Sequence, residues 1–242
     1  MAQSVTLIPP TSGNVSIASK LIAHLSRQYP TDEHEPFHLE HRLFSDTSSQ
    51  LPGSDVKQRS FTHILSFSHD PQHAFVSTTR PSNPDEDASV IIPSSSADSF
   101  MGLIMTKMQP FWYPRQMLSI EHGICVSIQE KGLIICIGDA RVSAKSQGAG
   151  TLRGTLVELF RREDLTRDGT NYTKEEAEAD QLWFQCALTE IISGTGETFT
   201  QTKIITRRTN DRRRNGEVDS KLADKVEPDW NLASLYMAIL RR

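Results

Sequence analysis

Residues 116–160 read QMLSIEHGICVSIQEKGLIICIGDARVSAKSQGAGTLRGTLVELF, and the rest of the chain is organised around them. Between residues 124 and 128, Ile, Val and Ile alternate with Cys and Ser, which is the periodicity of a β-strand. Residues 133–137, Leu-Ile-Ile-Cys-Ile, are too few for a helix, and their β-branched side chains predict a strand buried on both faces. Residues 153–160 alternate again after a glycine-rich loop. Sequential strands at this spacing predict an antiparallel meander.

The segments on either side of this meander add more strands and a few long helices. Strand periodicity occurs in Val5–Ile8, Phe37–Phe44, Phe61–Ser68, His73–Thr79, Val90–Pro93 and Phe199–Ile205, and helical periodicity occurs in Ala18–Leu25, Ala97–Trp112, Lys174–Ser193 and Asp229–Arg242. Ser12 or Asn14 is the expected N-cap of the first helix, and Asp229 that of the last. Because strands and helices do not alternate regularly, the pattern favours an α+β fold with an antiparallel sheet.

The composition limits the class of protein. The formal net charge is −4 and charged residues make up 23% of the chain, so there is no general bias toward polyanionic partners. Cys125, Cys136 and Cys186 are odd in number and lack a Cys-x-x-Cys pairing, which argues against a disulfide framework and against a structural zinc site. A reducing compartment fits this cysteine usage. With no secretory signal and no apolar run of roughly 20 residues, we expect a soluble, intracellular protein.

The sequence resembles the family of Mediator subunit 20, the TATA-binding-protein-related component of the Mediator head module. The resemblance rests on the order of an apolar helix, a strand, a glycine turn, a strand, a loop and the motif Arg-Gly-x-x-Val-Glu-Leu at residues 153–159. It extends from the strand at Ser4–Pro9 to the helix at Leu232–Met237. Polar inserts, which suggest a fungal-type member, lie near residues 45–60, 81–88, 161–173 and 207–227.

The resemblance implies a single domain over residues 1–242, with an antiparallel β-barrel-like sheet flanked by helices. It also implies a nuclear, non-enzymatic transcription coregulator. Such a subunit pairs with Mediator subunit 18, docks through the C-terminal segment of Mediator subunit 8 and helps to link regulators to RNA polymerase II.

Few residues suggest chemistry, and each has a simpler structural interpretation. His122 and Cys125 resemble a thiol nucleophile with its base, but their spacing on an extended segment places them on opposite faces. The histidines His34, His38 and His41 lie among acidic residues, yet they face in different directions along a strand, which favours a solvated surface over a metal site. We therefore expect no catalytic residue, no cofactor and no metal.

Two further segments resemble polyanion-binding sites. The glycine-rich residues 148–154 lack the Gly-Lys-Ser/Thr ending of a phosphate loop and precede a strand rather than a helix. The basic cluster of Arg207, Arg208 and residues 212–214 is interpreted first as a solvated linker, and second as a nuclear-import signal or a weak polyanion contact. No aromatic side chains interleave with it for base stacking.

Two other functions remain as alternatives. A tunnel-fold RNA triphosphatase needs inward-facing acids on several strands, whereas Glu121 and Glu158 stand singly among apolar residues. A protein that kinks DNA needs basic strands with apolar wedges, whereas residues 133–137 carry no Lys or Arg. Both patterns argue for a binding subunit.

The terminal helix provides the candidate partner contact. Leu232, Leu235, Tyr236 and Ile239 form one apolar stripe, which we expect to pack on this chain's own sheet. A second stripe lies on another side of the helix, and we expect it to contribute to a partner contact. Its members are Trp230, Ala233, Met237 and Leu240.

Overall fold

The structure is a computed structural model. It describes residues 2–10, 15–29, 32–47, 59–80, 87–109, 111–142, 150–161, 174–195, 205–208 and 229–241. Its strands are β1 (Ala2–Ile8), β2 (Asp32–Asp46), β3 (Phe61–Phe67), β4 (His73–Thr79), β5 (Ala88–Pro93), β6 (Trp112–Ile128), β7 (Leu133–Val142), β8 (Thr151–Arg161) and β9 (Ile205–Arg208). Its α-helices are α1 (Ala18–Gln28), α2 (Ser94–Thr106), α3 (Lys174–Ser193) and α4 (Trp230–Leu240).

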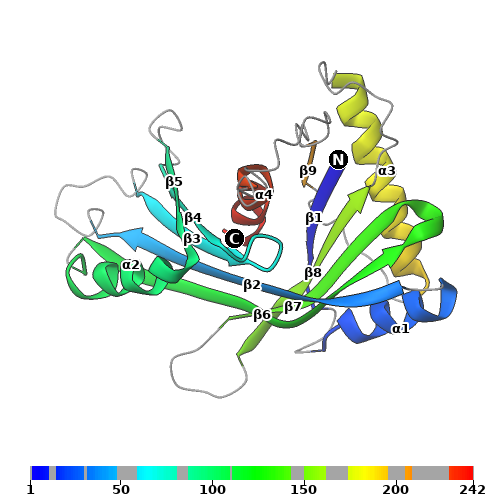
Figure 1. The fold of residues 1–242 in the computed structure, drawn as a ribbon, viewed down its shortest axis with the longest axis horizontal. Helices are drawn as coiled ribbons and strands as arrows, with labels where there is room; N and C mark the ends of the chain where they lie inside the picture. Colours follow the sequence, from blue (N-terminus) through cyan, green and yellow to red (C-terminus); the bar gives the residue numbers. More distant parts are fainter. Residues whose placement is uncertain are drawn as a thin grey trace, which may run out of the picture.

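All the described strands form one antiparallel sheet in the order β5-β4-β3-β2-β6-β7-β8-β1-β9. Consecutive strands pair as hairpins along most of this order, as the periodicity predicted. The N-terminal strand β1 joins the meander beside β8. The sheet curves without closing, with β5 and β9 at its two edges (Figure 1). The expected α+β class, with a barrel-like antiparallel sheet flanked by helices, is confirmed.

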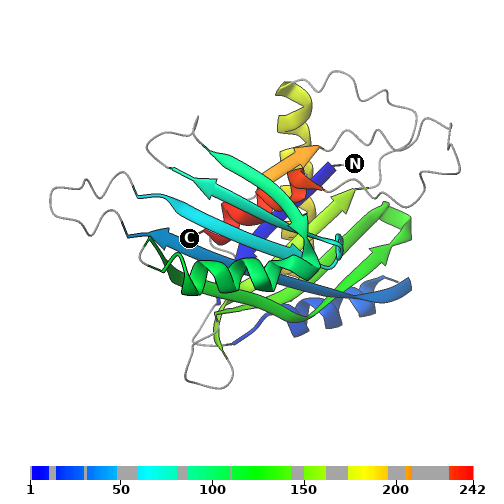
Figure 2. The ribbon, with the colours of Figure 1, turned by 60° about the vertical axis from the view of Figure 1, so that its left-hand side comes forward.

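Different helices cover the two faces of the sheet. On the concave face, α4 lies in the hollow between β3–β4 and β1–β9 (Figures 1 and 2). On the opposite face, α1 and α3 pack over β7 and β8. The third helix, α2, lies apart from these and packs against β4, β5 and the start of β6.

Strand β7 confirms the prediction of a strand buried on both faces. Ile135 and Ile137 pack under α1 and α3, whereas Cys136 faces the core that surrounds α4. The predicted turn before it is also present, because Gly132 has the left-handed φ of 58° that favours glycine. The predicted end at Gly138 is wrong, since β7 continues to Val142. A side chain at Gly138 would collide with Ile120 of β6, so the glycine permits close packing between β6 and β7.

The helix boundaries differ from the expected ones in the middle of the chain. The helix predicted over Ala97–Trp112 runs over Ser94–Thr106, and Trp112 begins the long strand β6. The aromatic residues at the end of the predicted helix are not fully buried: 65% of Phe111 is exposed, and Trp112 and Tyr113 have intermediate exposure. Propensity does not fix such ends, because the register between β2 and β6 extends pairing as far as Trp112.

The sequence placed α3 correctly, and of the residues predicted for its apolar side Leu188 and Ile191 are buried. Leu182 and Cys186, expected on its apolar side, are exposed. Its buried side chains are Phe184, Leu188, Ile191 and Ile192. Among the described helices, none has the length and apolar character needed to cross a membrane. The expected caps Ser12 and Asn14 and most of the four polar inserts lie outside the described residues.

Candidate functional sites

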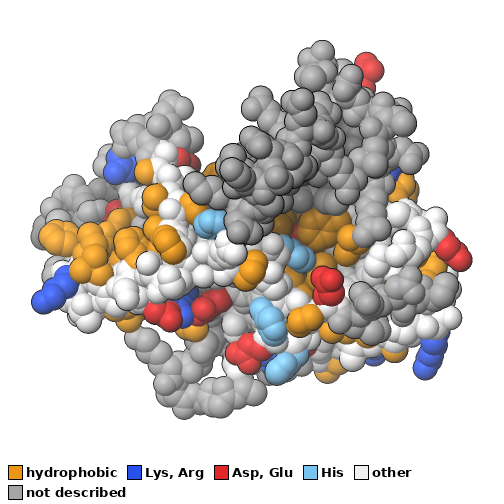
Figure 3. Space-filling view, viewed as in Figure 1, with side chains coloured by type: hydrophobic (Ala, Val, Ile, Leu, Met, Phe, Trp, Pro, Cys, Tyr) orange, Lys and Arg blue, Asp and Glu red, His pale blue; other side chains and the backbone are white. Residues whose placement is uncertain are grey.

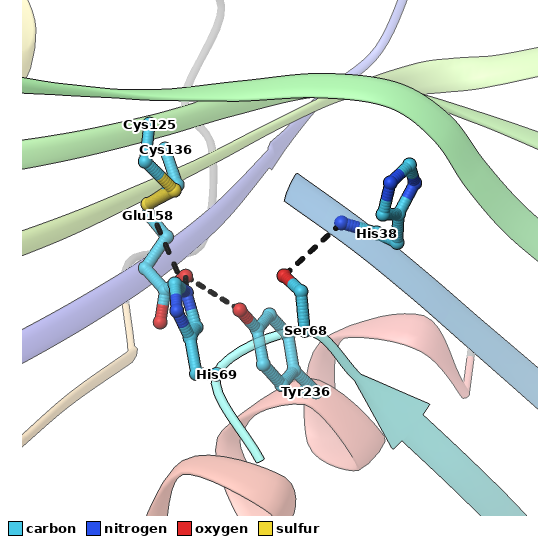
Figure 4. The surroundings of a disulfide bond; sticks show 7 residues. All are labelled: His38, Ser68, His69, Cys125, Cys136, Glu158 and Tyr236. Carbon is cyan, nitrogen blue, oxygen red and sulfur yellow. Dashed lines mark hydrogen bonds and ion pairs between the residues drawn. A yellow bond between two sulfur atoms is a disulfide. The ribbon is translucent and has the colours of Figure 1, made fainter. Parts of the chain in front are cut away.

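A cluster of polar side chains lies on the concave face of the sheet beneath α4. Cys125, Cys136 and Glu158 stand at directly paired positions of β6, β7 and β8, so they form a row across three strands. His69, from the turn between β3 and β4, lies against this row, and Tyr236 of α4 reaches it from the helix (Figure 4). We call these five residues the inner polar cluster.

Hydrogen bonds connect the inner polar cluster. The Tyr236 hydroxyl donates to Glu158 Oε2 at 2.5 Å, and His69 Nε2 lies 3.1 Å from the same oxygen. His69 Nε2 also lies 3.8 Å from Cys136 Sγ. Glu158 is fully buried, and its second oxygen, Oε1, has no hydrogen-bond partner among the described residues. Leaving a buried carboxylate oxygen unpaired is costly, so this oxygen requires an explanation.

Burial and charge shift two pKa values in this cluster. Burial opposes the charged form of His69, but the hydrogen bond and the negative charge of Glu158 outweigh it and raise the His69 pKa. Burial, followed by the Glu158 charge, raises the pKa of Tyr236 well above its usual value. Tyr236 therefore stays a hydrogen-bond donor, and it anchors α4 to the sheet at a buried point.

The structure corrects the expectation about cysteine. Cys125 and Cys136 form a disulfide, whereas Cys186 is free. Counting cysteines missed this pair, yet the hairpin contains the signal. Cys125 lies four residues before Gln129 and Cys136 four residues after Gly132, so a hairpin with its turn at 129–132 places them opposite each other.

The histidines behave differently from the solvated surface that we expected. His38 is exposed, as predicted, but His41 is fully buried, with Nε2 3.0 Å from Nδ1 of His63. Burial, then the neighbouring His63, lowers the pKa of His41 to about 3. Burial, then the charge of Arg241, lowers that of His63 to about 4. The side chain of His34 lies outside the described part.

The remaining sequence candidates do not converge on a site. His122 is exposed and Cys125 is buried, which agrees with their predicted placement on opposite faces. Residues 148 and 149 of the glycine-rich segment lie outside the described residues, as do residues 212–214 of the basic cluster, whereas residues 151–154 begin strand β8. Arg207 and Arg208 belong to edge strand β9 rather than to a linker. Pairing with β1 therefore extends the last strand past its predicted end.

The terminal helix is capped as predicted and is enclosed on every side but one. Asp229 accepts a hydrogen bond from the Leu232 amide at 3.0 Å. Both apolar stripes pack against this chain's own strands, because the curved sheet wraps around the helix. Of the four side chains assigned to a partner contact, Trp230 keeps intermediate exposure, and the other three, Ala233, Met237 and Leu240, are buried. A partner contact at those three requires α4 to leave the hollow.

A second candidate is an apolar surface on the other half of the molecule. Five large apolar side chains of β5, α2 and the segment after α2 are exposed, and hydrophobic atoms gather over this part of Figure 3. We call four of them the α2 surface: Val90 (52% exposed), Leu103 (47%), Met108 (37%) and Phe111 (65%); the fifth is Ile91 (37%). The neighbouring strand β5 is also an edge of the sheet. Exposed apolar side chains beside a free edge are typical of protein-binding surfaces.

A cleft of about 320 Å³ lies between α3 and the turn that joins β6 and β7. Lys131 and Glu190 form an ion pair at 2.7 Å across it, and the Lys131 ammonium lies 4.9 Å from the Tyr29 ring centroid. Trp183 and Leu133 contribute apolar walls. The ion pair is largely exposed, and we assign it little energy.

Comparisons with known proteins identify the family. The family model described as the TATA-binding related factor (TRF) of subunit 20 of the Mediator complex matches residues 1–241. No curated protein matches the chain. Among solved structures, the PH1819 protein from Pyrococcus horikoshii OT3 has a TM-score of 0.40 and 10% identity, over 86% of this chain and 95% of that one. The hypothetical protein NE1496 has a TM-score of 0.30 and 8% identity, over 74% of this chain and 80% of that one.

At these TM-scores, neither structural similarity bears on function. The family model, in contrast, matches almost the whole sequence, and the chain therefore belongs to the Mediator subunit 20 family, whose members are Mediator subunits in transcription regulation.

Proposed function

We propose that this chain is a non-enzymatic subunit of the nuclear Mediator head module that pairs with Mediator subunit 18 and helps to link regulators to RNA polymerase II. Family membership supports the Mediator role. The observation that carries the pairing is the α2 surface, where large apolar side chains of β5 and α2 are left uncovered next to an edge strand. Docking through the C-terminal segment of Mediator subunit 8 is proposed on family resemblance alone.

The contact with subunit 18 is proposed to use both the side chains and the backbone of this region. Edge strand β5 pairs only with β4 within the described sheet, so its other edge can add a strand from a partner. Val90 and Leu103 are each about half exposed and supply apolar area beside that edge. Large apolar anchors next to main-chain pairing provide the affinity and the specificity of such contacts.

Of the earlier partner candidates on α4, Trp230 remains the one that a partner can reach in this structure. Its ring lies 5.5 Å from that of Phe75, and part of its surface stays exposed. We therefore propose Trp230 as a contact at the rim of the hollow. Ala233, Met237 and Leu240 remain proposed contacts only for a form in which α4 has moved.

Co-expression with subunit 18, followed by size exclusion, tests the proposal. The Val90→Asp, Leu103→Glu double variant is expected to stay folded, because both side chains are already half exposed, and to lose subunit 18 from its elution peak. Leu182→Glu is the matched control, since Leu182 is a 63% exposed leucine on α3 and lies outside the α2 surface. Equal binding by the double variant and the control would place the contact elsewhere.

A further inference from the structure

We propose that the dithiol form of Cys125 and Cys136 binds a zinc ion together with His69 and Glu158. This site is separate from the α2 surface and goes beyond the proposed pairing with subunit 18. It is built from the inner polar cluster, and its chemistry is that of a soft divalent cation held by sulfur, nitrogen and oxygen.

Three of the four donors converge, and Glu158 stands beside them. One ligand atom each of His69, Cys125 and Cys136 lies within 4.8 Å of the others. Glu158 occupies the next position of the same row, directly paired with Cys136, and its carboxylate lies 3.1 Å from His69 Nε2. Two thiolates, one imidazole and one carboxylate are ligand types that tetrahedral zinc accepts.

Glu158 brings a negative charge to the site. It is fully buried, and its Oε1 atom has no hydrogen-bond partner among the described residues. A cation bound beside Glu158 would balance the carboxylate charge in this apolar surrounding. Tyr236 already holds the other oxygen through a 2.5 Å hydrogen bond, which is the arrangement of a metal ligand fixed by an outer partner.

The surroundings of the proposed zinc site are mostly apolar and buried, and solvent reaches the site at His69. The imidazole of His69 is enclosed by the rings of Phe37, Phe67 and Phe160, whose centroids lie 5.6, 6.4 and 5.3 Å away. Cys136 and Glu158 are fully buried, whereas 28% of the His69 side-chain surface is exposed. An ion can therefore enter the site from the solvent-exposed side of His69.

Zinc binding requires the disulfide to be opened first. In this structure the two sulfur atoms are bonded to each other. Two molecules of a thiol reductant such as glutathione reduce that bond, giving two cysteine thiols and one glutathione disulfide. The Zn²⁺ ion then replaces the two thiol protons, which pass to the solvent. Intracellular thiol pools favour the dithiol form, and the disulfide is the metal-free, oxidised state of the same site.

Metal analysis of the full-length chain tests the site. The chain is purified without chelator in the presence of a phosphine reductant and zinc, and then desalted. We expect one zinc ion per chain, and we expect cobalt(II) in its place to give the near-ultraviolet absorption of a cobalt–thiolate bond. A wild-type chain with reduced thiols and no metal would overturn the proposal, and so would a disulfide that persists under reductant.

Variants separate the four ligands from incidental binding. Cys125→Ser and His69→Ala are expected to lose the stoichiometric zinc, whereas Cys186→Ser, the change of the exposed free cysteine, keeps it. Tyr236→Phe removes the outer partner of Glu158 and is expected to weaken zinc binding by about 10- to 100-fold while leaving the cobalt absorption band in place. If Cys186→Ser loses the bound zinc, or His69→Ala retains it, the inner polar cluster is not the zinc site.

Discussion

The two halves of the sheet differ in how their faces are covered. In the half formed by β7 and β8, α4 covers one face and α1 with α3 the other, and Ile135 and Cys136 have no exposed surface. In the half formed by β3, β4 and β5, α2 buries only Ile104 among its own residues, and Val90 and Leu103 stay about half exposed. The covered half therefore supplies most of the buried core, whereas the open half leaves apolar side chains exposed, which is the feature that the proposed pairing with subunit 18 uses.

The largest expected effect tests the covered half. Ile135→Ala deletes a fully buried side chain between two packed layers and is expected to lower the free energy of unfolding by about 2–5 kcal/mol, through lost transfer energy and a cavity. Urea unfolding followed by circular dichroism measures it. Leu182→Ala is the control at an exposed leucine. Equal midpoints for the two variants would contradict the two-sided burial of β7.

The next largest effect on stability concerns the hydrogen bond between Tyr236 of α4 and Glu158 of β8. Tyr236→Phe keeps the ring but removes the hydroxyl that donates to buried Glu158. We expect a loss of about 1–3 kcal/mol, because the carboxylate loses a partner that water cannot replace. Comparing Tyr236→Phe, Glu158→Gln and the double variant in a thermodynamic cycle isolates the coupling. A cycle with no coupling would show that the helix is held by apolar packing alone.

A third effect appears as a dependence of stability on pH. The folded pKa values of His41 and His63 lie near 3 and 4, below the ordinary 6.5, so the unfolded chain takes up protons first. Stability from this pair is present above pH 6.5 and falls as the pH drops toward about 4, by up to about 1.4 kcal/mol per pH unit for each histidine. Urea midpoints across this range measure the slope, which the His41→Gln, His63→Gln double variant is expected to lose.

His69 acts in the opposite direction. Its folded pKa is raised, so the stability from its contact with Glu158 is fully present below the ordinary pKa and is lost as the pH rises through the raised value. Replacing His69 by Gln is expected to flatten the decline on the alkaline side and to leave the acid decline unchanged. A variant that changes only the acid decline would contradict this assignment.

The smallest expected effect on stability tests the open half. Phe111→Ser removes a side chain that is 65% exposed and is expected to change the free energy of unfolding by less than about 0.5 kcal/mol. The same change should weaken the pairing with subunit 18, because it removes apolar contact area from the α2 surface. A large loss of stability would show that Phe111 belongs to the core, and the comparison between the two halves would then fail.

The sequence by itself determined the element types and the central meander. The alternation at 124–128 and 153–160 and the apolar run at 133–137 correspond to β6, β8 and β7, because side-chain periodicity reflects local backbone geometry. The cap at Asp229 was also evident, since a carboxylate before a helix satisfies a free amide. The pairing of Cys125 with Cys136 was not predicted, because it depends on a turn that spans residues 129–132, which the structure establishes.

Only the tertiary structure decided what lies beneath α4. His69 and Tyr236 are far from Glu158 in sequence, and they meet it because the sheet curves around α4, which is buried on every side except that of Asn231, Ser234 and Ala238. His41 is also buried, beside His63, although we assigned the histidines to a solvated surface from the sequence; it shares the strand face of Leu39 and Leu43. Curvature accumulates from the twist of many paired strands, so no local stretch of sequence encodes it, and long-range contacts determine which polar side chains share a buried space.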